Sequence, residues 1–232
     1  MNGRGTGKDR NMINIVIADA ELELIPQKLA GHPSVRATSS KKRKSAEECL
    51  LDSSLHHSAM NSLQDAGRRG RPDIVHFCLL LALDSPVNSA KDELRVFVHT
   101  RNNIVLRFDP EIRLPRNYGR FTGLMEDLLS KGELVSPAGQ QLASSSRQTL
   151  GDLVHELGHP AIAFGEEGRA DYSLSFLGQY SDMTLIVGGF PHGGFLSDVL
   201  EYTAGMISIA DEKLMSWTVV ATLLAAYRLR RL

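Results

Sequence analysis

The sequence of 232 residues predicts an α/β fold with a mostly parallel sheet flanked by helices. Short apolar, β-branched runs alternate with longer stretches in which apolar residues recur at helical spacing, a pattern typical of parallel sheets. A hydrophobic content of 42% and a charged content of 23% are ordinary for a globular chain with a sizeable core. We therefore expect one domain over residues 12–232, preceded by a flexible tail at residues 1–11.

The first part of the chain predicts one strand, two helices and an exposed loop. The expected elements are a central strand at residues 12–18, a short helix at 22–29, an exposed charged loop at 31–46 and a helix at 50–63 that begins near Asp52 or Ser53. The basic run from Lys41 to Lys44 resembles a nuclear-import or nucleic-acid patch. We favour a solvated loop, because runs of charge usually face water. His56 and His57 are expected at the surface.

The middle of the chain predicts a hairpin between helices. Residues 73–83 are expected to pass from strand into helix. Residues 94–100 and 103–108 alternate apolar and polar on either side of a turn, which predicts a β-hairpin. Residues 133–148, rich in Ser, Gln and Gly, are expected to form a linker or an irregular arm. Between these stretches lies one apolar helix face, spaced i, i+3, i+4, i+7 and i+8, made of Phe121, Leu124, Met125, Leu128 and Leu129.

The last part of the chain predicts three strands and three helices around a glycine-rich loop. The expected elements are a helix at 150–157, a strand at 161–164, a helix at 174–180, strands at 184–187 and 206–209, and a helix from about Leu214. The loop, residues 188–194, follows the strand at 184–187. We expect the strands at 184–187 and 206–209 to lie side by side, with their loops at one edge of the sheet.

Such an edge is where α/β proteins bind small molecules, so the loop indicates a pocket for a nucleotide-type cofactor. The loop lacks the dinucleotide fingerprint G-x-G-x-x-G. Gly194 and Phe195 stand where a phosphate loop needs Lys and Ser or Thr. Neither NAD nor ATP is therefore indicated. On the loop alone, a tight connection between two core elements is an equal alternative.

The segment from His155 to His159 matches the zinc-site pattern H-E-x-x-H. A zinc hydrolase that uses His155, Glu156 and His159 is therefore an alternative function. Pro160 directly follows the second histidine, and Gly158 is typical of a helix C-cap. We favour the polar end of a helix and expect no metal site.

Arginines crowd the middle of a chain whose net charge is only −1. Arg113, Arg116 and Arg120 are spaced i, i+3 and i+7, so a helix would present all three on one face. Guanidinium groups suit phosphates, and RNA binding is favoured over a solvated helix face. Asp73 is expected to hold Arg71 by a charge-assisted hydrogen bond. The other members of the group are Arg68, Arg69, Arg101 and Arg107.

Cysteine content and hydropathy predict a cytoplasmic protein. Cys49 and Cys78 are the only cysteines, too few for a disulfide scaffold or a cysteine zinc site. The first residues lack the apolar stretch of a signal peptide. The longest apolar run, Val219 to Tyr227, is well short of the ~20 residues that cross a bilayer. We expect no membrane contact, and a nucleolar location in a nucleated cell.

Four stretches together resemble one known family. They are Gly70 to Ile74 with Leu83 to Pro86, Arg113 to Met125, Gly188 to Gly193, and Ile207 to Ile209 leading to Leu214. They look like the archaeal-like branch of the SPOUT-class methyltransferases that methylate N1 of a pseudouridine in small-subunit ribosomal RNA during ribosome biogenesis. The resemblance runs from about Asn14 to Tyr227. It implies a SPOUT-type α/β fold with a C-terminal trefoil knot and an inserted β-hairpin.

The resemblance also implies the ligands. S-adenosylmethionine would be held by Phe164, Gly188, Gly193, Ile209, Ala210, Asp211, Glu212, Lys213 and Leu214. Small-subunit ribosomal RNA would be gripped by Arg71, Arg113, Arg116 and Arg120, with Asp73 orienting Arg71.

A homodimer is implied as well, with Trp217, Val220 and Leu224 of the C-terminal helix in its interface. Ribosomal assembly proteins are further expected partners. No residue is evident as the base, and the candidates are Asp73, Asp84 and solvent. A non-catalytic RNA-binding assembly factor is another alternative.

Overall fold

Strand β1 (Ile13–Ala20) is the centre of the sheet, and all of its residues are buried. It pairs in parallel with β2 (Leu94–Thr100) on one side and with β7 (Met183–Gly188) on the other. The computed structural model describes residues 12–89 and 93–230, so the tail expected at residues 1–11 lies outside the described residues. The central strand expected from residue 12 is thus confirmed and extends to Ala20.

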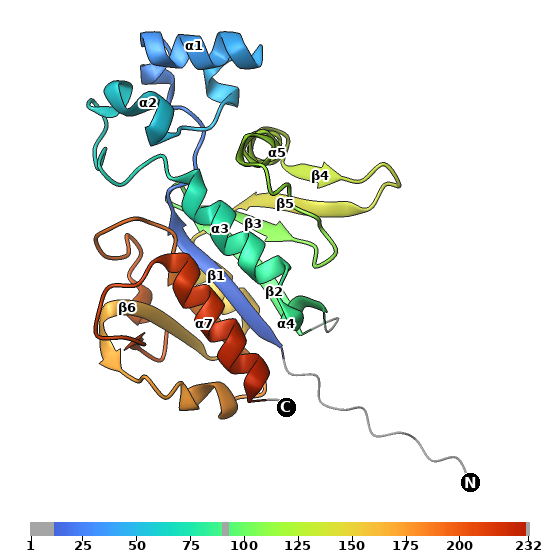
Figure 1. The fold of residues 1–232 in the computed structure, drawn as a ribbon, viewed down its shortest axis with the longest axis vertical. Coiled ribbons are helices and arrows are strands. Elements are labelled where there is room, and N and C mark those ends of the chain that lie inside the picture. Colours follow the sequence, from blue (N-terminus) through green and yellow to red (C-terminus); the bar gives the residue numbers. More distant parts are fainter. Residues whose placement is uncertain (1–11, 90–92, 231–232) are drawn as a thin grey trace.

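The sheet has eight strands in the order β4-β5-β3-β2-β1-β7-β6-β8 (Figure 1). Four parallel pairs join β2, β1, β7, β6 and β8, and three antiparallel pairs add β3, β5 and β4. The remaining strands are β3 (Ile104–Phe108), β4 (Glu133–Val135), β5 (Gln141–Arg147), β6 (Ala161–Ala170) and β8 (Met206–Ser208). The mostly parallel sheet and the β2–β3 hairpin are as predicted.

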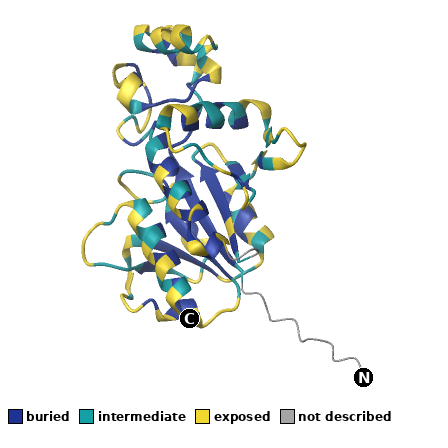
Figure 2. Cartoon of the chain, turned by 45° about the vertical axis from the view of Figure 1, so that its right-hand side comes forward, coloured by how far each residue is buried: buried dark blue, intermediate teal, exposed yellow. Residues whose placement is uncertain are grey.

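Helices cover both faces of this sheet. Successive side chains of β1 point to opposite faces, so Ile15 and Ile17 pack in one core cluster and Val16 in another. The first cluster lies under α3 (Pro72–Leu83), α5 (Tyr118–Lys131) and α7 (Ser216–Leu229), and the second lies under α6 (Leu150–Leu157). Figure 2 shows the buried strands between these helices, whose outer faces are exposed. A short helix, α4 (Pro86–Ser89), follows α3.

A small lobe beside the sheet has a core of its own (Figure 1, top). It consists of η1 (Gln27–Leu29), α1 (Pro33–Lys42), η2 (Ala46–Glu48) and α2 (Ser53–Met60). The helix expected from Asp52 or Ser53 is confirmed, with the Asp52 side chain capping α2. His56, expected at the surface, is buried: its ring nitrogens meet the backbone N–H of Asp52 and the Thr38 hydroxyl.

Two predictions for the residues before this lobe's second helix were wrong. Residues 22–29 form only η1, and residues 31–46 contain α1 rather than a loop. The His32 side chain caps α1 and Pro33 opens it, whereas only Val35 of the helix is buried. Because a helix with one buried residue shows no apolar period, sequence periodicity could not find it.

The basic run at the end of α1 is partly internal. Lys42 and Lys44 both form ion pairs with Glu126 of α5, whose side chain is only 1% exposed, and Lys44 also pairs with Asp127. The preference for a solvated run was therefore wrong for these two lysines, while Lys41 and Arg43 are exposed.

Three other stretches also differ from expectation. Residues 133–148 form β4 and β5 instead of a linker, and β5 pairs with β3 in the sheet. These strands read as irregular because they are largely exposed and therefore polar. Residues 73–83 are helical throughout, since α3 begins at Pro72. The helix expected at 174–180 is reduced to η3 (Ser175–Gly178), and η4 (Val199–Glu201) was not expected.

The C-terminal segment contacts the glycine-rich loop at the start of α7. After β8, the chain continues into α7, which lies beside α3 (Figure 1). The Ser216 hydroxyl at the start of α7 donates a hydrogen bond to the carbonyl oxygen of Gly188. The trefoil knot expected in this segment stays a prediction. Among the described residues, no helix is both long and apolar enough to span a bilayer.

Candidate cofactor cavity and basic surface

A cavity of about 750 Å³ opens at the carboxyl ends of β6, β7 and β8. Its walls come from the end of β6, the glycine-rich loop after β7, and the segment from β8 into α7. The expected crevice between two strand–loop units is therefore present, with one correction. β7 and β8 are not neighbours, because β6 lies between them and pairs with both.

Most of the residues expected to hold a cofactor line this cavity. Eight of the nine do so: Phe164, Gly188, Gly193, Ile209, Ala210, Glu212, Lys213 and Leu214. Asp211 is not among the lining residues, and its carboxylate accepts a hydrogen bond from the Tyr172 hydroxyl instead. These eight residues span 50 positions of the sequence, from Phe164 to Leu214, and meet in one cavity.

Close packing explains the glycines of the loop. A Cβ on Gly188 would lie 2.6 Å from the Phe190 ring, and one on Gly189 would lie 2.7 Å from Ala20. Gly193 has a φ of +80°, which L side chains rarely adopt. Larger residues at these positions would displace the cavity wall.

Sequence reasoning missed the acidic character of the cavity. Five carboxylate residues line it: Glu166, Glu167, Asp198, Glu201 and Glu212. The first two project from an irregularity in β6, where the pairing with Ile207 shifts from Phe164 to Arg169. The Lys213 ammonium lies 3.9 Å from the Glu166 carboxylate. A strand that bulges at its carboxyl end is not recognisable from periodicity, so the two glutamates seemed to lie beyond the strand.

A buried aspartate at the end of β1 fixes the far wall. The Asp19 carboxylate accepts hydrogen bonds from the backbone N–H groups of Leu196 at 2.7 Å and Ser197 at 2.9 Å, and from the Ser197 hydroxyl at 2.8 Å. Burial alone would raise the pKa of Asp19, but hydrogen bonds from His99 and Ser197 outweigh it and lower the pKa. Asp19 has a φ of 48°, a strained backbone that the packing around it maintains.

A smaller cavity of about 370 Å³ adjoins the basic segment, and Arg71 lines both cavities. The Arg71 guanidinium donates two hydrogen bonds to Asp73, at 2.8 Å and 2.6 Å, which raise the pKa of Arg71. The contact expected between these two residues is therefore present. Tyr118, also in this cavity, donates to Asp52 at 2.6 Å. Asp84 lines neither cavity.

The three downstream arginines do not share a helix face, which corrects the prediction. Helix α5 begins only at Tyr118, with Asn117 as its N-cap, so Arg113 and Arg116 lie in the preceding loop. The i, i+3, i+7 spacing was misleading because a helix cap interrupts it. All three side chains are exposed. Arg116 lies 3.6 Å from Asp84 in a pair that faces solvent.

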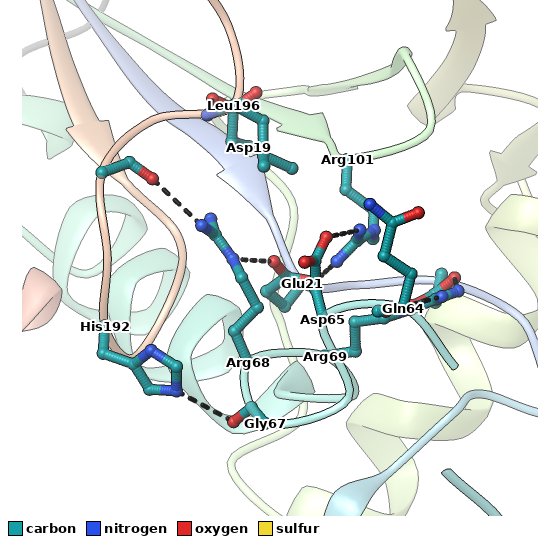
Figure 3. Close-up of polar contacts among 12 residues, drawn as sticks. Asp19, Glu21, Gln64, Asp65, Gly67, Arg68, Arg69, Arg101, His192 and Leu196 are labelled. Carbon is teal, nitrogen blue, oxygen red and sulfur yellow. Dashed lines mark hydrogen bonds and ion pairs between the residues drawn. The ribbon is translucent and has the colours of Figure 1, made fainter. Parts of the chain in front are cut away.

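Three other arginines of the crowded segment pair with buried carboxylates (Figure 3). Arg68 and Arg101 pair with the buried carboxylate of Glu21, and Arg69 pairs with that of Glu23. Arg107 bonds the Glu156 carboxylate. The arginine-rich segment therefore contains an internal set, Arg68, Arg69 and Arg101, and an exposed set, Arg113, Arg116 and Arg120.

The H-E-x-x-H segment lies at the end of α6. The helix ends at Leu157, and Gly158 adopts the left-handed C-cap conformation, as expected. The Glu156 carboxylate is bonded by Arg107 and by the Gln148 amide. Within residues 12–89 and 93–230, no three His, Cys, Asp or Glu side chains gather as a metal site would require.

Comparison with known proteins identifies relatives along almost the whole chain. The family model of the EMG1/NEP1 methyltransferases matches residues 15–228. The ribosomal RNA small subunit methyltransferase Nep1 of Thermococcus sibiricus is 47% identical over 220 residues, which is 93% of this chain and 97% of that protein. Nep1 of Pyrococcus furiosus is 43% identical over 222 residues, 94% of this chain and 97% of that protein.

A solved structure agrees with these matches. The crystal structure of Archaeoglobus fulgidus Nep1 bound to S-adenosylhomocysteine aligns with a TM-score of 0.83 and 39% identity, over 96% of this chain and 99% of that chain.

Proposed function

This chain belongs to the EMG1/NEP1 methyltransferase family, and we propose that it methylates N1 of a pseudouridine in small-subunit ribosomal RNA. The methyl donor is S-adenosylmethionine, whose product S-adenosylhomocysteine is bound in the solved relative. The observation that carries the proposal is Arg71, which lines both the large cavity and the smaller one beside the basic surface. One residue therefore adjoins the spaces assigned to cofactor and RNA.

The large cavity suits S-adenosylmethionine in its chemistry. The adenine ring needs apolar surfaces, and Phe164, Ile207 and Leu214 supply them. The sulfonium and ammonium groups are cations, which the carboxylates of the wall attract, whereas Lys213 suits the cofactor's carboxylate. The glycines of the loop carry no side chains, so a ligand can approach the loop backbone closely. Asp211, which lies outside the wall, is the weakest of the nine proposed contacts.

The exposed arginines support the RNA side of the proposal. Arg113 and Arg116 lie in the loop before α5, and Arg120 lies in the first turn of that helix. Arg116 lines the smaller cavity together with Arg71. Guanidinium groups in water bind phosphates with little desolvation cost. Both carboxylate oxygens of Asp73 accept hydrogen bonds from Arg71, so we assign Asp73 to orienting that guanidinium.

For catalysis, the chain must supply alignment and charge. The bound cofactor brings a methyl group already activated by its sulfonium. The target base must leave its stack to reach the cavity, and the exposed arginines would hold the flanking backbone while it does so. The N1 proton is lost to Asp73 or to solvent. We favour Asp73 over Asp84, because Asp84 lines neither cavity.

We further propose a homodimer formed through α3 and α7. Phe77 is 50% exposed, Leu81 40% and Met215 58%, although all three are apolar. Val220 and Leu224, expected in the interface, are instead buried in the chain's own core, so the proposed interface is corrected to Phe77, Leu81 and Trp217. Light scattering would report a dimer for the wild type and for Leu55→Glu, whose side chain lies on α2, and a monomer for Phe77→Glu. A dimeric Phe77→Glu would contradict this interface.

A cytoplasmic location and contacts with ribosomal assembly proteins complete the proposal. Both follow from the proposed RNA substrate, which the exposed side chains of Arg113, Arg116 and Arg120 support. A non-catalytic assembly factor would bind RNA and lack affinity for S-adenosylhomocysteine. A zinc hydrolase would contain stoichiometric zinc, lost in His159→Ala.

Calorimetric titration with S-adenosylhomocysteine tests the cavity. We expect one saturable site per chain. Ala210→Trp, which fills the cavity, should weaken binding at least about tenfold. Ala37→Trp, an exposed position on α1, serves as the matched control and should bind normally. Normal binding by Ala210→Trp would remove the cofactor from this cavity.

A further inference from the structure

A buried glutamate, Glu21, joins the turn that carries Arg71 to the glycine-rich loop. Figure 3 shows its carboxylate between Arg68 and Arg101. The Glu21 side chain is fully buried and accepts hydrogen bonds from Arg68 Nε at 2.6 Å and Arg101 Nη1 at 2.8 Å. Its backbone N–H donates to the Gly189 carbonyl at 3.1 Å, and its carbonyl accepts from the Arg71 N–H at 2.9 Å. Glu21 is thus bonded both to the cavity loop and to the proposed RNA-gripping arginine.

Arg68 extends this connection along the loop. Its Nη1 donates to the Gly194 carbonyl at 3.0 Å, and its Cζ lies 4.4 Å from the centroid of the Phe190 ring. Beside it, Nε2 of His192 donates to the Gly67 carbonyl at 3.0 Å. Phe190, His192 and Gly194 line the cavity, but Arg68 does not. Arg68 therefore supports the cavity wall from behind.

The neighbouring Arg69 shows that an arginine can pair with a buried glutamate without touching the glycine-rich loop. Arg69 bonds Glu23 twice, at 2.7 Å each, and its side chain is 12% exposed against 10% for Arg68. The remaining contact of Arg69 is the Gln64 carbonyl, not the loop. Arg68 Nη2 is buried and has no hydrogen-bond partner among the described residues. A purely stabilising arginine would be better satisfied, as Arg69 is.

We propose that Arg68 is a positioning residue for methyl transfer: anchored on Glu21, it sets the glycine-rich loop for the cofactor and couples that loop to RNA bound at Arg71. The inference rests on the proposed function. RNA that engages Arg71 changes the position of the turn from residue 64 to 71, and Arg68 transmits the change to Phe190 and Gly194. Coupling of this kind is reciprocal, so cofactor and RNA should alter each other's affinity by the same factor.

The test compares the two neighbouring arginines. Affinity for S-adenosylhomocysteine is measured by calorimetry on the wild type, Arg68→Gln and Arg69→Gln, with and without an RNA stem-loop that contains pseudouridine. We expect Arg68→Gln to weaken binding of S-adenosylhomocysteine about tenfold. The ratio of its affinities with and without RNA should fall close to one. Arg69→Gln, which removes an equally buried ion pair, should leave both quantities within about twofold of the wild type.

Arg68→Lys separates positioning from stability. A lysine keeps a cation for Glu21 but cannot bond Glu21 and Gly194 with a planar fork. The melting temperature of Arg68→Lys should lie closer to that of the wild type than the melting temperature of Arg68→Gln does. Its affinity for S-adenosylhomocysteine should stay reduced. If Arg68→Gln does not fold, Arg68→Lys alone decides, and wild-type affinity in this variant overturns the proposal.

Two failures remain distinguishable. Equal losses in Arg68→Gln and Arg69→Gln, or no loss in Arg68→Gln, would overturn the positioning role of Arg68 while the wild type still binds S-adenosylhomocysteine. A wild type that does not bind it would contradict the methyltransferase function itself.

Discussion

The arginines of the middle segment fall into two sets with opposite surroundings. Arg68, Arg69 and Arg101 each meet a carboxylate that is almost fully buried, on Glu21 or Glu23. Arg113 and Arg120 are exposed, and Arg116, 85% exposed, has only a loose pair with Asp84. The first set is neutralised inside the protein, and the second keeps its charge for a ligand.

The difference teaches that an arginine's role is set by its partner rather than by its neighbours in sequence. A guanidinium beside a buried carboxylate holds the fold, because removing either partner leaves a charge without compensation. A guanidinium in water adds little to stability and can bind phosphate. Substitutions in the two sets should therefore affect different measurements.

The largest expected effect is on stability, in the internal set. Glu21→Ala leaves Arg68 and Arg101 without their shared carboxylate, so we expect a loss of roughly 3–5 kcal/mol in the free energy of unfolding. Chemical denaturation measures it. Arg120→Ala is the control from the exposed set and should change stability by less than about 0.5 kcal/mol. A Glu21→Ala variant as stable as the wild type would dissolve the distinction between the two sets.

The next effect is on RNA binding, in the exposed set. Replacing Arg113, Arg116 and Arg120 together by Ala should weaken RNA binding on the order of 100-fold and reduce the salt dependence by about two units of slope. The melting temperature should stay unchanged. Filter binding at several salt concentrations measures both quantities.

The matched control for that triple variant lies in the small lobe. Arg36, Lys41 and Arg43 are also exposed, so their replacement by Ala makes the same change in net charge. We expect a much smaller loss of RNA affinity. Equal losses from the two triple variants would mean that only net charge matters.

The smallest effect concerns a buried carboxylate that has no arginine partner. The pKa of Asp19 is lowered in the folded protein, so its contribution to stability is present above its unfolded pKa of about 3.9 and is lost as pH falls through the folded value. Asp19→Asn should therefore be less stable than the wild type at neutral pH, and the difference should shrink in acid. A difference that is constant with pH would show that the charge of Asp19 is not what stabilises the loop.

Much of the fold was predictable because its signals are local and apolar. The strands at β1, β7 and β8, the hairpin and the apolar face of α5 all follow from periodicity. Helix α1 and strand β5 were missed because they bury few residues. Their positions depend on capping and on pairing with distant strands, which periodicity does not report.

The site was predictable in its residues but not in its electrostatics. The resemblance supplied eight cavity-lining residues, and the spacing of Arg71 and Asp73 indicated their contact. It did not supply Asp19, Glu21 or the glutamates of the β6 bulge, whose roles arise only when segments far apart in sequence meet. The internal arginines were grouped with the exposed ones for the same reason.

Methyl transfer from labelled S-adenosylmethionine to RNA tests the central claim most directly. Two stem-loops of the same sequence are compared, one with pseudouridine at the target position and one with uridine. N1 of pseudouridine carries a hydrogen, whereas N1 of uridine forms the glycosidic bond and has none to lose. We predict one methyl group on the pseudouridine RNA and none on the uridine RNA. Equal labelling of both RNAs, or labelling of neither, would contradict the proposed function.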